Sequence, residues 1–89
     1  MEKHLKELFR DTNKALLDAA KKDLDDQNEL SALKALHAVK GAALLLGASR
    51  LISWLAQAEN EINSGQRRNA KKTIIKAQLE INSLISDDA

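Results

Sequence analysis

Apolar residues recur at spacings of three and four in four successive stretches of this chain, and this repeat most constrains its fold. Such spacing places side chains on one face of an α-helix, which can then be buried. Proline is absent and only three glycines are present, so little interrupts the repeat. The pattern predicts helices over about residues 3–21, 29–46, 50–64 and 67–85. Because the links are short, we expect an all-α, antiparallel up-and-down four-helix bundle that forms one domain over residues 1–89.

Turn and capping signals set the expected helix ends. Residues 22–27 contain three aspartates without an apolar rhythm, and they predict a polar turn. A Ca²⁺ loop would need a longer run of oxygen ligands and a turn glycine. Asn28 and Ser49 are expected to cap the N-termini of the second and third helices. Gly47 is expected to end the second helix, since glycine readily adopts a positive φ.

Each stretch also predicts which side chains are buried. In the first helix the buried face comprises Leu5, Leu8, Phe9, Thr12, Leu16, Ala19 and Ala20, with Leu17 on its flank. In the second it comprises Ala32, Leu36, Val39, Ala43 and Leu46. In the third it comprises Leu51, Leu55, Ala58 and Ile62, with Ile52 and Trp54 on the flanks. In the fourth it comprises Ala70, Ile74, Ala77, Gln78, Ile81, Leu84 and Ile85.

Composition excludes several classes of function. The 14 basic and 13 acidic residues give a net charge of +1, which offers no support for nucleic-acid binding. The absence of cysteine excludes disulfides and thiolate metal sites and is compatible with a reducing compartment. The longest apolar run, residues 42–46, is too short to span a bilayer. We therefore expect a soluble, cytoplasmic protein, and a monomer because one bundle can bury all four apolar faces.

His37 lies opposite the densest apolar stripe of the second predicted helix. Lys40 follows at i+3 and Gly41, which has no side chain, at i+4. A solvent-exposed imidazole is a nucleophile near neutral pH, and an ammonium group would stabilise a phosphoryl oxygen. The stretch could therefore carry a phosphoryl group and offer it to a second protein. Simpler interpretations remain: His37 is an ordinary surface residue or a hydrogen-bonded core residue, and Gly41 is required for close helix packing.

A longer motif surrounds this histidine: His37-x-x-Lys40-Gly41-x5-Gly47-Ala48-x-x-Leu51. Apolar positions on both sides, and an acid on the next helix, extend it: Phe9, Leu16, Ala20, Leu51, Trp54, Ala58 and Glu59. Together they resemble the histidine-containing phosphotransfer (HPt) domain family over roughly residues 5–86. The departures are Val39, where the family often has Leu, and Leu44-Leu45, where small or polar residues are common.

The resemblance implies a phosphorelay intermediate. His37 would accept a phosphoryl group from the aspartyl phosphate of one receiver domain and pass it to the aspartate of another. Lys40 would stabilise the phosphoryl charge. Glu59 matches a family position that often orients the imidazole, and an antiparallel return from Gly47 brings it to the level of His37. The alternative for Glu59 is a solvated surface side chain.

Residues around His37 are expected to dock the partner. Leu33 and Leu44 fall on the same side of the helix as His37, so they form either an apolar collar or a second packed face. We expect Leu33 to be partly packed and Leu44 to be exposed, with Lys34 adding charge at the rim and Gly41 leaving room. Receiver domains of response regulators or hybrid histidine kinases would be the partners.

No cofactor or metal is expected in this chain, because it has neither a Gly-rich nucleotide loop nor a credible acidic Mg²⁺ cluster. The receiver would supply Mg²⁺, and the chain would be a carrier without its own ATP-dependent kinase activity. Two rival functions stay open: a helical adaptor in which His37 is incidental, and a metal or haem bundle. The latter has only His4 and His37, on different helices, as histidine ligands.

Overall fold

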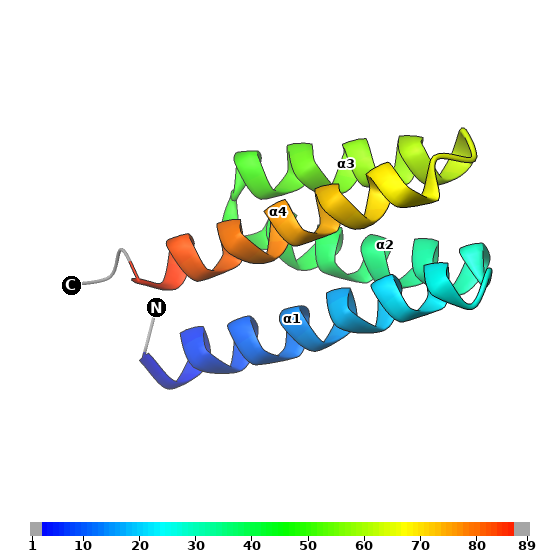
Figure 1. Cartoon of the computed structure of the whole chain (residues 1–89). Coiled ribbons are helices and arrows are strands. Elements are labelled where there is room, and N and C mark those ends of the chain that lie inside the picture. The colour runs from blue at the N-terminus through cyan, green and yellow to red at the C-terminus, as the bar shows by residue number, and fades with distance from the viewer. Residues whose placement is uncertain (1–2, 87–89) are drawn as a thin grey trace.

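Four helices account for almost all of the chain. The computed structural model describes residues 3–86, with α1 at Lys3–Asp25, α2 at Glu29–Leu46, α3 at Ser49–Asn63 and α4 at Arg67–Ser86. Successive helices run in opposite directions, so that the start of α1 lies at the same end of the bundle as the end of α4 (Figure 1). The predicted all-α, antiparallel four-helix bundle is confirmed. None of the four described helices combines the length and apolar character needed to cross a membrane.

Each helix packs against two neighbours, in the cyclic order α1, α2, α3, α4 and back to α1. Among the described residues, the diagonal pairs α1–α3 and α2–α4 make no close backbone contact. The outward faces of α2 and α4 therefore lie on opposite sides of the bundle (Figure 1).

The core between the helices consists of leucine, isoleucine, valine and alanine side chains. The predicted faces of α2, α3 and α4 are confirmed at their central positions, which are Ala32, Leu36, Val39, Ala43, Leu51, Leu55, Ala58, Ile62, Ala70, Ile74, Ala77 and Ile81. Three predicted positions differ: Gln78 and Leu84 are half-buried, and Leu46 is 40% exposed. The side chain of Ile85 lies outside what the structure describes.

The predicted end and buried face of α1 were partly wrong. The helix continues to Asp25 rather than stopping near Lys21, because Leu24 carries the buried face one turn further despite the flanking aspartates. Leu17, predicted on the flank, is fully buried. The α1 core residues are Asn13, Leu17, Ala20 and Leu24, whereas Leu5, Leu8, Thr12 and Ala19 are exposed and Phe9 and Leu16 are half-buried.

Side-chain contacts with α4 accompany this rotation of α1. The Nζ atom of Lys21 donates to Gln78 Oε1 at 2.8 Å, and Lys14 Nζ donates to Asn82 Oδ1 at 3.3 Å. Buried Asn13 is satisfied locally, since its Nδ2 atom donates to the Phe9 carbonyl at 2.7 Å. Packing between two helices, rather than the apolar repeat alone, therefore sets the phase of α1.

Two of the three predicted caps on α2 and α3 are confirmed. Asn28 Oδ1 accepts from Ser31 N at 3.4 Å, and Gly47 ends α2 with φ = 66°. The Ser49 cap was wrong: Ala48 is the N-cap of α3, without a side-chain hydrogen bond, and Ser49 is the first helical residue. Ala48 is buried and its N–H donates to the Ala43 carbonyl at 3.0 Å, so packing beneath the turn fixes where α3 begins.

Asp18 on α1 is held by hydrogen bonds that link the stability of the bundle to pH. Gln78 Nε2 donates to Asp18 Oδ1 at 2.8 Å, and Lys21 Nζ lies 3.3 Å from the same oxygen. The hydrogen bond from Gln78, followed by that from Lys21, lowers the pKa of the Asp18 carboxyl below its ordinary value of 3.8. The unfolded chain therefore takes up the proton at higher pH than the folded chain does. The stabilisation is present at neutral pH and is lost as pH falls through the folded pKa.

We expect Asp18→Asn to lower the stability slightly at pH 7 and to have less effect near pH 3. The side chain is 68% exposed, so the change should stay well below about 1 kcal/mol. Urea denaturation at several pH values measures it. Asp11→Asn is the matched control, because Asp11 is 67% exposed and pairs with the adjacent Arg10 rather than with another helix. A stability difference for Asp18→Asn that does not narrow at low pH would contradict the prediction.

Candidate functional site

Helix α2 presents apolar side chains to solvent as well as to the core. Of the eight exposed large hydrophobic residues among those described, four belong to this helix: Leu30, Leu44, Leu45 and Leu46. Leu45 is 91% exposed and Leu44 is 61% exposed. Exposed apolar surface of this kind often marks a site of protein contact. The outward face of α2 is therefore the strongest candidate interface on the bundle.

His37 lies on this face with its imidazole exposed. The imidazole makes no hydrogen bond with any residue between positions 3 and 86. It lines an open hollow of about 510 Å³ between α2 and α3, together with Leu33, Lys34, Glu59, Asn60 and Asn63. An unprotonated ring nitrogen would thus keep its lone pair available to an incoming electrophile.

Lys40, one turn after His37, reaches across to α3. Its Nζ atom donates to Glu59 Oε1 at 3.0 Å, with side-chain exposures of 32% for Lys40 and 20% for Glu59. This hydrogen bond joins two charged groups, which makes it stronger than a bond from a neutral imidazole would be. Glu59 therefore shares the hollow with His37, as the antiparallel register predicted, but its carboxylate binds Lys40 instead of the imidazole. The expected Glu59–imidazole hydrogen bond is absent from this structure, and the orienting role of Glu59 stays a prediction.

Gly41 lies in the interior of α2, one turn beyond His37, and is exposed. A Cβ atom built at this position would meet nothing within 4 Å. Close packing inside the described bundle therefore does not explain the glycine. An interior glycine costs about 1 kcal/mol relative to alanine, so its presence is consistent with a requirement that lies outside the free chain.

Gly41→Ala is expected to stabilise the free protein by roughly 0.5–1 kcal/mol, because alanine favours the helix and nothing clashes. For a domain of this size, that corresponds to a rise in Tm of a few degrees. Gly47→Ala is the matched control: its Cβ would also meet nothing within 4 Å, but its φ of 66° strains any L side chain. Thermal unfolding should therefore shift in opposite directions for the two variants. A fall in Tm for Gly41→Ala would contradict the prediction.

The predicted docking residues surround His37 with different exposures. Leu33 is half-buried and packs against the core, whereas Lys34, Gly41 and Leu44 are exposed. The hollow itself includes Leu33 and Lys34. The expected burial of Leu33 and exposure of Leu44 are thus found, while their roles in docking stay predictions.

Sequence reasoning missed two polar residues of α3 beside the histidine. Asn60 and Asn63 line the hollow with His37 and Glu59. Asn63 follows Glu59 by one helical turn, and Asn60 comes directly after Glu59 in the sequence. The antiparallel register that placed Glu59 opposite His37 would also have placed both asparagines there.

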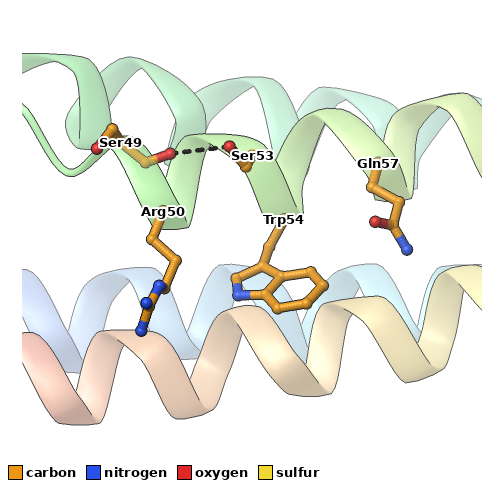
Figure 2. A pocket seen from close by; sticks show the side chains of 5 residues that line it. All are labelled: Ser49, Arg50, Ser53, Trp54 and Gln57. Carbon is orange, nitrogen blue, oxygen red and sulfur yellow. Dashed lines mark hydrogen bonds between the residues drawn. The ribbon is translucent and has the colours of Figure 1, made fainter.

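A second hollow of about 340 Å³ lies on the other side of α3, where it faces α4. Figure 2 shows Arg50 and Trp54 extending from α3 toward the neighbouring helices, while the Ser53 hydroxyl donates to the Ser49 carbonyl at 3.1 Å. Lys76 Nζ lies over the Trp54 ring, 5.1 Å from the ring centroid, in a cation–π contact. Neither a histidine nor a carboxylate of the described residues lines this hollow.

One cation at the start of α4, Lys71, forms an ion pair with another helix. Lys71 pairs with Asp25, and these two residues border a shallow hollow with Leu24, Arg67 and Arg68. No group of three or more histidine or acidic residues in the described part of the chain is placed to hold a metal ion. The aspartate cluster at the end of α1 accordingly shows no metal-binding arrangement.

Comparison with protein families gave one finding. A family model described as the Hpt domain matches residues 4–87, which span all four helices. Comparisons with curated proteins and with solved structures gave no significant match. The matched segment includes the whole α2 face that carries the exposed histidine.

Proposed function

The chain belongs to the Hpt domain family, and we propose that it is a phosphorelay carrier whose phosphoryl group is held on His37. Hpt domains act in histidine phosphotransfer in two-component signalling, as phosphocarrier modules rather than kinases. The observation that best supports His37 as the acceptor is its exposed imidazole, free of hydrogen bonds to the described residues, on the apolar face of α2. His4 is exposed too, but it lies at the start of α1, away from the α2–α3 hollow.

The proposed reaction moves one phosphoryl group between two proteins. The unprotonated ring nitrogen of His37 attacks the phosphorus of an aspartyl phosphate on a receiver domain. The N–P bond forms as the O–P bond breaks, and the aspartate leaves as a carboxylate. The proton on the other ring nitrogen stays through this step and is then released to solvent. Transfer to a second receiver reverses these bond changes: the ring takes a proton back from solvent, the N–P bond breaks as a new O–P bond forms, and the imidazole leaves neutral.

Neighbouring residues would have separate roles in this reaction. Lys40 would stabilise charge on the phosphoryl oxygens, and Lys34 would add positive charge at the rim of the hollow. Leu33, Gly41 and Leu44 would contact the receiver. The receiver would supply Mg²⁺ and most of the groups that activate the phosphoryl, since this chain is proposed to bind neither ATP nor a metal. We also propose that the chain acts as a cytoplasmic monomer.

Phosphotransfer tests this proposal. A panel of receiver domains labelled at their aspartates is mixed with the chain, and the label on the chain is followed with time. The expected product is acid-labile and alkali-stable, as a phosphoramidate is. The absence of transfer across a broad panel, with the helical fold intact by circular dichroism, would favour a helical adaptor in which His37 is incidental.

A further inference from the structure

We propose that Glu59 and a phosphoryl group on His37 compete for Lys40, and that this competition keeps the phosphorylated histidine a ready donor. The inference rests on the proposed function and concerns its energetics. Glu59 would then act on Lys40 and on the phosphoryl charge, instead of orienting the imidazole. Its effect would be to limit how strongly the chain stabilises the group it carries.

The geometry of the resting site supports this competition. Lys40 is i+3 from His37 on α2, yet its ammonium is already bound to Glu59 Oε1 at 3.0 Å. Both side chains of the pair are less than one-third exposed, so water screens the pair less than it would a fully exposed one. Glu59 also lines the hollow into which His37 projects. One carboxylate therefore both binds Lys40 and lines the hollow that a phosphoryl group would enter.

The negative charge of Glu59 determines whether it raises or lowers the free energy of the phosphorylated state. A phosphoryl group brings close to two negative charges at neutral pH. If the phosphoryl group binds the Lys40 ammonium, the partly buried Glu59 carboxylate is left without its partner, which is unfavourable. If Lys40 stays with Glu59, the phosphoryl loses a cation and faces a nearby anion. Glu59 raises the free energy of the phosphorylated state in either case.

This arrangement suits a carrier that must both accept and donate. A cation bound without competition would stabilise phosphohistidine and slow its onward transfer. A cation shared with Glu59 stabilises phosphohistidine only in part. The equilibrium constants for accepting and for donating the phosphoryl group therefore stay closer to one. The interpretation of Glu59 as an imidazole-orienting residue predicts little change or weaker phosphorylation for Glu59→Gln, because the glutamine Oε1 atom can still accept from an imidazole N–H.

The test compares Glu59→Gln with Glu61→Gln, which removes the same charge from the same helix. Glu61 accepts from Thr73 on α4, so it lies on the side of α3 that faces away from α2. Each variant is equilibrated with an aspartyl-phosphorylated receiver, and the label on His37 is divided by that on the receiver. We expect Glu59→Gln to raise this ratio about fivefold, within the usual range for a charge-assisted hydrogen bond. Glu61→Gln should leave it within about twofold of the wild type, because surface charges farther away are screened.

A double-mutant cycle separates sharing of Lys40 from simple repulsion. In a Lys40→Gln background, Glu59→Gln should raise the ratio clearly less than it does in the wild type, since only direct repulsion by Glu59 remains once the shared cation is gone. A fall in the ratio for Glu59→Gln, no change, or an equal rise in the Lys40→Gln background would each overturn the inference. Circular dichroism of every variant confirms that the bundle is intact.

A partner-independent measurement keeps the inference distinct from the proposed function. Phosphoramidate can label the histidine directly: a new N–P bond forms to His37 as the P–N bond to ammonia breaks. The half-life of the labelled chain should then be about fivefold longer for Glu59→Gln than for the wild type, if the freed Lys40 stabilises the phosphoryl. Labelling by phosphoramidate without transfer from any receiver would refute the proposed function alone. An unchanged half-life would refute the inference alone.

Discussion

Replacing His37 with glutamine is expected to abolish phosphoryl transfer to the chain while leaving the bundle folded. Glutamine has no ring nitrogen lone pair that can attack phosphorus, so the covalent step is lost rather than slowed. The imidazole is exposed and forms no hydrogen bond with the described residues, so its removal should cost little stability. Label on the variant should fall below about one-thousandth of that on the wild type, in the range seen when a covalent nucleophile is removed.

His4→Gln is the matched control for this experiment. It makes the same chemical change at the other histidine of the chain, which is also exposed but lies at the start of α1. The control variant should accept label at the wild-type rate. Label that persists on His37→Gln, or that disappears from His4→Gln, would show that His37 is not the acceptor. Matching thermal unfolding curves for both variants would exclude misfolding as the cause.

The bundle could be predicted from the sequence because apolar spacing specifies helices and their faces directly. The positions Leu36, Leu55 and Ile74 illustrate this: each lies at the centre of a predicted stripe, and each is fully buried. The phase of α1 could not be obtained in the same way. Its apolar residues cover more than half of the helix surface, so two overlapping faces fit the repeat equally well. Packing against α2 and α4 selects one of them, and no local pattern contains that information.

In the candidate site too, the sequence predicted positions along one helix but not contacts between helices. Spacing within one helix singled out His37, Lys40 and Gly41, and the family resemblance supplied their expected roles. The antiparallel register placed Glu59 at the level of His37, and the two residues line the same hollow. The choice of partner for Glu59 could not be predicted, because Lys40 and His37 are both within reach from adjacent turns of α2. The hydrogen bond to Lys40 is decided by side-chain charge and conformation, which a helical register does not specify. The absence of neighbours around Gly41 likewise became visible only in three dimensions.

Leu44→Gln is expected to weaken binding to a receiver domain by roughly 10- to 100-fold. Leu44 is 61% exposed in the free chain, two turns beyond His37, and burial of a leucine contributes about 1.5–3 kcal/mol to association. Glutamine has similar helix propensity and adds no charge, so the free bundle and the phosphoryl chemistry should be little changed. Calorimetric titration with the receiver that transfers fastest would measure the loss of affinity. Transfer at saturating receiver should remain near the wild-type rate, since only docking is impaired.

Leu79→Gln provides the matched control on the opposite side of the bundle. Leu79 is 62% exposed, so the substitution removes a similar amount of exposed apolar surface. It lies on α4, where it lines a hollow with Arg50 and Trp54 of α3. Since α2 and α4 face away from each other, a receiver seated over His37 cannot also cover Leu79 unless it wraps around the bundle (Figure 1). The control should therefore bind with wild-type affinity. Equal losses for the two variants would mean that exposed leucines act through general hydrophobicity, and a loss for Leu79→Gln alone would move the docking surface to α4.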